Sequence, residues 1–243
     1  MSSSTANFKP QTWLAPLAVL LVAAWALRPL ENRLLAPQVP LGQFSGLGGS
    51  GLLGALGGMR AAVASGFWLR TNEAWEKQDA ARTTALLQLT VAADERPLYF
   101  WLNGACMLAY DLPAWGIASD TSETVRRARR AEGAAAAESF LNASLRAHPG
   151  SAELMIELAN LQLRGRNDPA AAAEWFRRAA EQPGAPYYAA RIHAELLREL
   201  GRPEEALAWL RKILPGLPAD DPAAQRSVVE QRIKALEAGR GEK

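Results

Sequence analysis

The stretch YYAARIHAELLRELGRPEEALAWLRKILPGLP, residues 187–218, predicts two short amphipathic helices in succession. In each half, small and apolar residues recur at steps of three and four, which places them on one face of a helix. Gly201 ends the first helix, and Pro203 begins the second at a position where its missing N–H costs no hydrogen bond. Pro215 and Pro218 prevent continuation of the second helix. The expected core positions are Ala190, His193, Ala194 and Leu197 in the first helix, and Ala206, Leu210 and Ile213 in the second.

The second helix carries a signature that recurs along the chain: an alanine, a large apolar residue four positions later, and a small or apolar residue three positions after that. The other copies are Ala85-Leu89-Ala92, Ala137-Leu141-Ser144 and Ala172-Phe176-Ala179. A proline or glycine terminates each copy, at positions 97, 149, 184 and 218, so the steps are 52, 35 and 34 residues. One helix pair cannot bury its own apolar face and must stack on its neighbours, so this periodicity predicts an all-α fold of stacked pairs.

The 187–218 unit resembles a tetratricopeptide repeat (TPR). The small, apolar and proline positions of that family are matched by Ala190, Ala194, Leu197, Gly201, Ala206, Leu210 and Pro218. The resemblance implies a right-handed α-solenoid of about four helix pairs over residues 59–220, closed by a capping helix at 221–238. Residues 53–165, with GGMRAAVASGFWLR and YFWLNGACMLAYDL, are also similar to a group of membrane-anchored bacterial repeat proteins of unestablished function. That second resemblance implies repeat architecture and anchoring only.

The N-terminal region predicts a membrane anchor. Residues 1–11 are polar and expected to be disordered, whereas residues 12–27 carry no charge. Sixteen residues span roughly 24 Å as a helix, so a hydrocarbon core of about 30 Å requires extension to residue 30 with Arg28 reaching the headgroups. The main alternative is a cleaved signal peptide ending at Ala24-Trp25-Ala26, although tryptophan is unfavourable at such a site. An interfacial or buried helix is disfavoured because the segment has no polar face.

The anchor predicts a single-pass protein of the bacterial inner membrane, but its orientation is poorly determined. Lys9 and the amino terminus precede the apolar segment, and Arg28 and Arg33 follow it. The positive-inside rule counts basic residues, and the two sides nearly tie. The side of the remaining domain therefore stays undetermined, with a slight preference for the periplasm.

Residues 31–58 predict a Pro/Gly-rich linker. They contain two overlapping GxGxxG matches, at 46–51 and 49–54, as glycine-rich sequence produces by chance. A dinucleotide site needs a preceding strand and an acidic residue about twenty positions later, and neither is visible. No Gly-Lys-Ser/Thr follows either, so a P-loop is excluded. Close helix–helix contact through Gly54 and Gly58 is the alternative to a flexible linker.

Residues able to carry out catalysis are scarce. The chain has one cysteine and two histidines, and it contains no zinc-binding histidine pair and no nucleophile elbow. Cys106 is expected to be a small buried hydrophobe, His148 a residue at a helix end, and His193 a hydrogen-bonded core residue. The net charge of +2 argues against a nucleic-acid binder. We therefore predict a protein that is not an enzyme, with no cofactor, no metal and no evident small-molecule substrate.

An insertion at residues 111–130 separates the first repeats. Ser119, Asp120, Thr121 and Ser122 are candidate N-caps for a new helix. The four arginines that follow these residues cannot all lie on one face of a helix, so we expect them to be exposed to solvent in its first turns. Contact with anionic lipid or an acidic partner is the alternative. This basic cluster comprises Arg126, Arg127, Arg129 and Arg130.

The resemblance also implies where a partner would bind, because in TPR proteins the first helix of each pair lines a concave groove. The residues predicted for this groove are Tyr188, Arg191, Glu195 and Arg198 in one repeat, and Glu153, Ile156, Asn160 and Leu163 in another. Their hydrogen-bond donors suit an extended peptide with acidic groups, although solvated positions with local ion pairs are an equal alternative. The expected function is a membrane-tethered scaffold for a peptide or partner protein. The alternative is a structural subunit of a bacterial envelope or secretion assembly that packs through its apolar N-terminal region.

Overall fold

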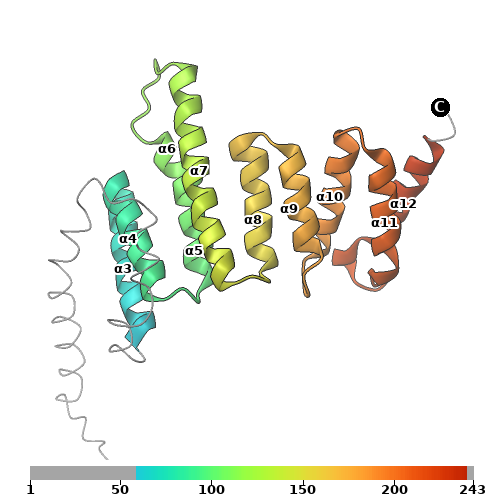
Figure 1. Ribbon diagram of the computed structural model, residues 1–243, viewed down its shortest axis with the longest axis horizontal. Helices are drawn as coiled ribbons and strands as arrows, with labels where there is room; N and C mark the ends of the chain where they lie inside the picture. Colours follow the sequence, from blue (N-terminus) through green and yellow to red (C-terminus); the bar gives the residue numbers. More distant parts are fainter. Residues whose placement is uncertain (1–58, 240–243) are drawn as a thin grey trace, which may run out of the picture.

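The computed structural model describes residues 59–239, and over this range the chain is all-α, without a β-strand. The helices stand side by side in one row that follows the order of the sequence (Figure 1). They are α3 (Arg60–Glu76), α4 (Ala80–Ala93), α5 (Leu98–Cys106), α6 (Leu112–Ala114), α7 (Glu123–Ala147), α8 (Ala152–Leu161), α9 (Pro169–Ala180), α10 (Tyr187–Glu199), α11 (Pro203–Ile213) and α12 (Arg226–Ala238). Short π-helical segments, η3 (Met107–Asp111) and η4 (Gln162–Arg166), continue α5 and α8. Two 3₁₀ turns, η5 (Leu214–Gly216) and η6 (Pro222–Ala224), precede α12.

Helices that are neighbours along the chain pack on one another. The pairs α3–α4, α5–α7, α8–α9 and α10–α11 are in contact, and α12 lies on α11 at the end of the row. The buried apolar side chains form three successive clusters, one spanning α3 to α8, one α8 to α10, and one α10 to α12. Each helix therefore loses apolar surface to its sequence neighbours, which is the largest favourable contribution to folding.

The helix starts follow local chemistry that is visible in the sequence. Side-chain oxygens of Asp79, Ser122, Ser151 and Asp168 each accept a hydrogen bond from a backbone N–H in the first helical turn. Such caps satisfy donors that have no partner inside the helix. Of the four candidates in the insertion, Ser122 is the N-cap of α7, with 3.4 Å between its hydroxyl and the Val125 nitrogen.

The predicted helix break at Gly201 is confirmed. Gly201 has φ of +72°, a left-handed conformation that glycine adopts without steric cost. The Arg202 N–H donates to the Leu197 carbonyl at 2.9 Å, and the Gly201 N–H donates to the Arg198 carbonyl at 3.0 Å. This pair of bonds is a Schellman motif, and α11 then begins at Pro203 as predicted.

The recurring signature marks buried positions in three of its four copies. Each residue of Ala172-Phe176-Ala179 and Ala137-Leu141-Ser144 is buried, as are Ala206 and Leu210. The prediction is wrong by one residue in α4, where the buried series with the same spacing is Leu86, Thr90 and Ala93, and Ala85, Leu89 and Ala92 are only half-buried. The cause is the packing of α4 against α3, since Thr90 turns inward and its hydroxyl lies 3.5 Å from that of Thr71.

The insertion has a definite structure. After η3 and the single turn α6, a loop over residues 115–122 leads into α7, whose first two turns comprise the rest of the insertion. With 25 residues, α7 extends past the ends of its neighbours (Figure 1).

No helix in residues 59–239 is long and apolar enough to cross a membrane. The predicted disordered tail at 1–11, anchor at 12–30 and linker at 31–58 lie outside the described residues.

Candidate functional site

The first helices of three successive pairs expose a common series of positions. On α5 and α8, with the π-helical segments that continue them, these positions recur at steps of four, three and four, and on α10 at steps of seven and three, which keeps them on one side of each helix. We call this surface the first-helix face. It comprises Tyr99, Asn103, Cys106 and Tyr110 on α5 and η3, Glu153, Glu157, Asn160 and Arg164 on α8 and η4, and Tyr188, Glu195 and Arg198 on α10.

One polar contact joins α5 to α8 on this face, and a second lies within α8. The Cys106 thiol donates to Glu157 Oε1 at 3.7 Å, and the Asn160 amide donates to Glu157 Oε2 at 3.5 Å. The expectation of a buried cysteine is wrong, because Cys106 is exposed. The neighbouring Gly104 and Ala105 occupy the inward side of α5 instead.

The surroundings of the exposed thiol disfavour its ionisation. Desolvation by the surrounding side chains, together with the Glu157 carboxylate, raises the pKa of Cys106 to about 11. Both causes disfavour the thiolate, the form of cysteine that acts as a nucleophile or metal ligand. Cys106 is therefore an exposed group that stays in its thiol form at neutral pH.

Of the four predicted binding positions on α8 and η4, two reach the surface and two pack inward. Glu153 is exposed and Asn160 is partly exposed, but Ile156 is 8% exposed and belongs to the core between α8, α9 and α10. Leu163 is half-buried against the same core. The outward positions are Glu157 and Arg164 instead, because Ile156 and Leu163 lie on the side of α8 and η4 that packs into the cluster shared with α9 and α10.

On α10, Tyr188 is 43% exposed and Arg198 is exposed, as predicted. The Arg198 guanidinium donates to Glu195 Oε1, with an Nη2–Oε1 distance of 2.5 Å. This hydrogen bond lowers the pKa of Glu195, so the carboxylate stays ionised. The aromatic ring and this ion pair are both available at the surface.

Arg191, by contrast, is not a free surface residue. Its Nη1 donates to the carbonyl oxygens of Ala223 and Ala224, both at 3.1 Å. Burial, with a smaller effect from Arg232, lowers the pKa of Arg191. The predicted role of Arg191 in partner binding is therefore corrected: its side chain holds the segment before α12 against α10.

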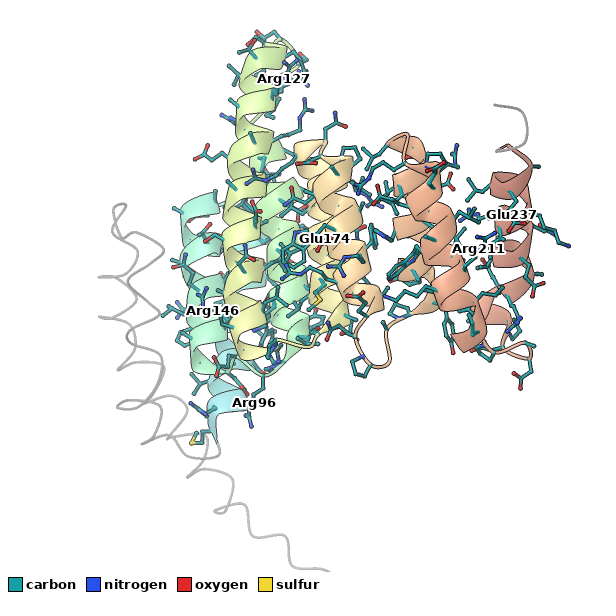
Figure 2. All side chains as sticks on the ribbon, turned by 45° about the vertical axis from the view of Figure 1, so that its right-hand side comes forward. Arg96, Arg127, Arg146, Glu174, Arg211 and Glu237 are labelled. Atoms are coloured by element: carbon teal, nitrogen blue, oxygen red, sulfur yellow. The ribbon has the colours of Figure 1, made fainter. Side chains whose placement is uncertain are left out.

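Most of the basic cluster serves the insertion itself. Arg126 donates to the carbonyl oxygens of Ala118, Ser119 and Thr121 at 2.9–3.0 Å, and Arg129 donates to that of Trp115 at 2.9 Å. Arg130 is paired with Glu123. Arg127 lies at the outer end of α7 (Figure 2), exposed to solvent. Arginines 126 and 129 thus fix the loop onto α7, a role that sequence spacing could not reveal.

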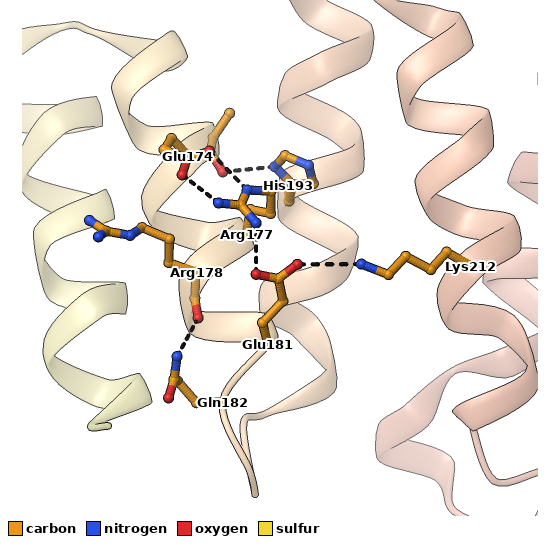
Figure 3. A network of polar contacts seen from close by, with 8 residues as sticks. Glu174, Arg177, Arg178, Glu181, Gln182, His193 and Lys212 are labelled. Atoms are coloured by element: carbon orange, nitrogen blue, oxygen red, sulfur yellow. Dashed lines mark hydrogen bonds and ion pairs between the residues drawn. The ribbon is translucent and has the colours of Figure 1, made fainter. Parts of the chain in front are cut away.

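The second helices α9 and α11 are joined by ion pairs of their own (Figure 3). Arg177 pairs with Glu174 at 2.6 Å and with Glu181 at 2.7 Å, and Lys212 of α11 reaches Glu181 at 3.4 Å. The Arg178 guanidinium lies 4.6 Å from the centre of the Trp175 ring. The charged side chains of this surface are therefore paired with one another. The exposed tyrosines, Tyr99 and Tyr188, lie on the first-helix face instead.

The expectation for His193 is confirmed. It is 6% exposed, and its Nδ1–H donates to the Ala173 carbonyl at 2.7 Å. Figure 3 shows His193 beside α9, and its ring packs edge-on to Trp209 with 4.8 Å between the ring centres. Burial lowers the pKa of His193 below 6.5, despite the opposing effect of this hydrogen bond. The imidazole is therefore neutral in the folded protein at neutral pH.

The free energy of unfolding is expected to fall as the pH is lowered below about 6.5, because the unfolded chain binds a proton at His193 before the folded protein does. This loss begins near the unfolded pKa and saturates below the lowered folded pKa. Urea unfolding of the wild type and of His193→Asn, measured from about pH 7.5 to about pH 5, isolates the effect. The asparagine amide can donate to the Ala173 carbonyl without titrating, so its pH dependence should be shallower. Equal slopes would contradict the prediction.

Within residues 59–239 no group of three or more histidine, cysteine, aspartate or glutamate residues could hold a metal ion. His148 Nε2 lies 2.8 Å from the Glu95 carbonyl and joins the loop after α4 to the end of α7. Comparisons of the chain with protein-family models, with curated proteins and with solved structures found no match.

Proposed function

We propose that the chain is a membrane-tethered scaffold whose helix pairs form a right-handed TPR-like solenoid and whose first-helix face binds a peptide or partner protein. The observation that carries the proposal is the first-helix face itself. Tyrosines are exposed at both ends, Tyr99 by 57% and Tyr188 by 43%, with carboxylates, an amide and arginines between them. Tyrosine and arginine are enriched among the residues that dominate binding energy at protein interfaces.

The arrangement of the helices supports a solenoid. Pairs in a single row, each packed on the next and closed by α12, are the arrangement of a solenoid, a fold that binds partners along an extended surface (Figure 1). The contacts above revise the proposed site. Ile156, Leu163 and Arg191 leave it. The residues that enter it are Tyr99, Asn103, Cys106, Tyr110, Glu157 and Arg164. The tether is the uncharged segment within residues 12–30.

Site-specific photocrosslinking in cells tests this function. A benzophenone amino acid in place of Tyr99 or Tyr188 should give the same covalent adduct with one partner. The same group at Asn142, which is exposed on the second helix α7, is the matched control and should give none. An adduct from all three positions, or from Asn142 alone, would place the binding surface elsewhere. Resistance of the intact protein to alkaline carbonate extraction, with an uncleaved N-terminus, tests the tether.

The alternative function is a structural subunit of an envelope or secretion assembly that packs through the apolar N-terminal region. The two functions differ in what residues 1–58 do. If the protein is a scaffold, adducts from Tyr99 and Tyr188 should persist when residues 1–58 are deleted and the remainder is directed to the same compartment. If it is an assembly subunit, partner contact should disappear with that region.

A further inference from the structure

A groove of about 410 Å³ lies beside the insertion, apart from the exposed tyrosines of the first-helix face. Both π-helical segments line it, η3 through Ala109 and Tyr110, and η4 through Arg164 and Gly165. Single-turn π-helical segments occur frequently at functional sites, because they displace the residues that follow them. The volume falls within the range of about 300–1,000 Å³ that is typical of small-molecule sites.

The apolar side of the groove comes from η3, α6 and the loop that follows, through Ala109, Pro113, Ala114 and Ile117. The loop is held by the hydrogen bonds from Arg126 to three of its carbonyl oxygens, so this wall is fixed before any ligand arrives. A preformed apolar wall lowers the entropic cost of binding.

The charged side of the groove consists of Arg126, Arg130 and Arg164, and no aspartate or glutamate lines it. Arg126 is occupied by the loop, and Arg130 is paired with Glu123, which does not line the groove. Arg164 is exposed and makes no hydrogen bond or ion pair within residues 59–239. The groove therefore presents the guanidinium of Arg164 and the remaining N–H groups of Arg130, whose Nη2 is paired with Glu123, to an anion.

The charged side chains of the lining donate hydrogen bonds, and this indicates which kind of anion the groove can hold. Guanidinium groups donate hydrogen bonds and cannot accept them. A peptide in the groove would bring backbone N–H groups that need acceptors, whereas a carboxylate on an apolar body brings acceptors alone. The Tyr110 hydroxyl on the same wall is buried without a partner among the described residues, which is a costly state for a polar group.

We propose that this groove binds a small apolar carboxylate, with the carboxylate on Arg130 and Arg164 and the apolar body against Pro113, Ala114 and Ile117. The groove shares Tyr110 and Arg164 with the first-helix face, and most of its other lining residues lie in the insertion. Its ligand is a small carboxylate and not the protein partner proposed for that face, so the two proposals can fail separately. Fork-shaped pairing of arginine with a carboxylate supplies orientation as well as attraction.

The probe for the test is 4-phenylbutyrate, measured by saturation-transfer NMR with the full chain at low salt. Arg164→Gln should weaken its binding about 10-fold, as expected for the loss of a hydrogen bond to a charged group. Arg127→Gln removes an exposed arginine of the same region that does not line the groove, and it should change the affinity less than about 2-fold. Acetate, which lacks the apolar body, and 4-phenylbutanol, which lacks the charge, should each bind at least about 10-fold more weakly than the probe.

Three results would overturn the proposal. One is the absence of 4-phenylbutyrate binding, and another is equal weakening by Arg164→Gln and Arg127→Gln, which would indicate general attraction to a basic surface. The third is stronger binding of an acetylated dipeptide ending in phenylalanine, which would identify a peptide as the occupant. Ile117→Glu provides a second variant, because a carboxylate on the apolar wall should abolish binding while circular dichroism shows the helices intact.

Discussion

Replacement of Gly133 by alanine is expected to lower the free energy of unfolding by about 3 kcal/mol, near the upper end of the usual cost of overpacking. Gly133 lies where α7 crosses α6 and η3. A Cβ atom at this position would stand 2.2 Å from Pro113 Cγ and 2.7 Å from the Leu108 carbonyl oxygen. A proline ring and a backbone carbonyl cannot rotate away as the end of a flexible side chain can, so α7 itself must shift.

Two other glycines provide matched controls for this change. A Cβ at Gly104 would lie 2.6 Å from Leu87 Cδ1, but that methyl group can move by rotamer change, so Gly104→Ala should cost about 1 kcal/mol. Gly66 in α3 has no atom within 4 Å of the added Cβ, and Gly66→Ala should stabilise the protein by about 0.5–1 kcal/mol. Urea unfolding of the three variants measures their free energies of unfolding and so ranks the three changes. A loss below about 1 kcal/mol for Gly133→Ala would mean that α7 does not contact α6 closely.

Local chemistry made much of the fold predictable. The break at Gly201, the restart at Pro203 and the N-cap before α7 each depend on a few adjacent residues, so the sequence determines them directly. The recurring signature also located the buried side of α7, α9 and α11. These are the features that period and capping rules describe.

The wrong predictions concern which side of a helix is buried, where packing against other helices determines that side. The periodicity of α8 defines an apolar face but does not reveal that Ile156 and Leu163 pack into the cluster shared with α9 and α10. The same limit applies in α4, where contact of Thr90 with Thr71 of α3 moves the buried side by one residue. Cys106 became exposed because Gly104 and Ala105 take the inward positions of α5. Long-range packing therefore determines how each helix is turned about its axis, and so which residues face the core. Periodicity alone places the buried face only to within about one residue.

The groove could not be predicted, because its parts are far apart in the sequence. Arg164 and Arg130 are separated by the rest of α7 and by α8, and only the stacking of two helix pairs brings them to one site. The basic cluster predicted a charged surface, but half of it binds carbonyl oxygens of the insertion. Spacing along one helix cannot show which arginine is already occupied.

Arg191 and Arg198 were predicted to be equivalent exposed residues, and replacing each with alanine should now separate them. Arg191→Ala removes the donor for two carbonyl oxygens and leaves those of Ala223 and Ala224 without this partner, with Ala224 fully buried. Loss of hydrogen bonds from a charged donor is expected to cost about 2 kcal/mol. Arg198→Ala removes only an exposed pair with Glu195 one helical turn away, and it should change stability by less than about 0.5 kcal/mol.

Because α12 is the last helix of the row, the effect of Arg191→Ala should be local. Amide hydrogen exchange should accelerate in α12, where Val229 and Ile233 pack on the final cluster, before it changes in α8 or α9. Arg191→Lys retains the charge but not the forked donors, so it should recover only part of the protection. Equal exchange rates in the two alanine variants would show that the carbonyl contacts of Arg191 do not secure α12. In that case Arg191 would return to the set of residues available to a partner.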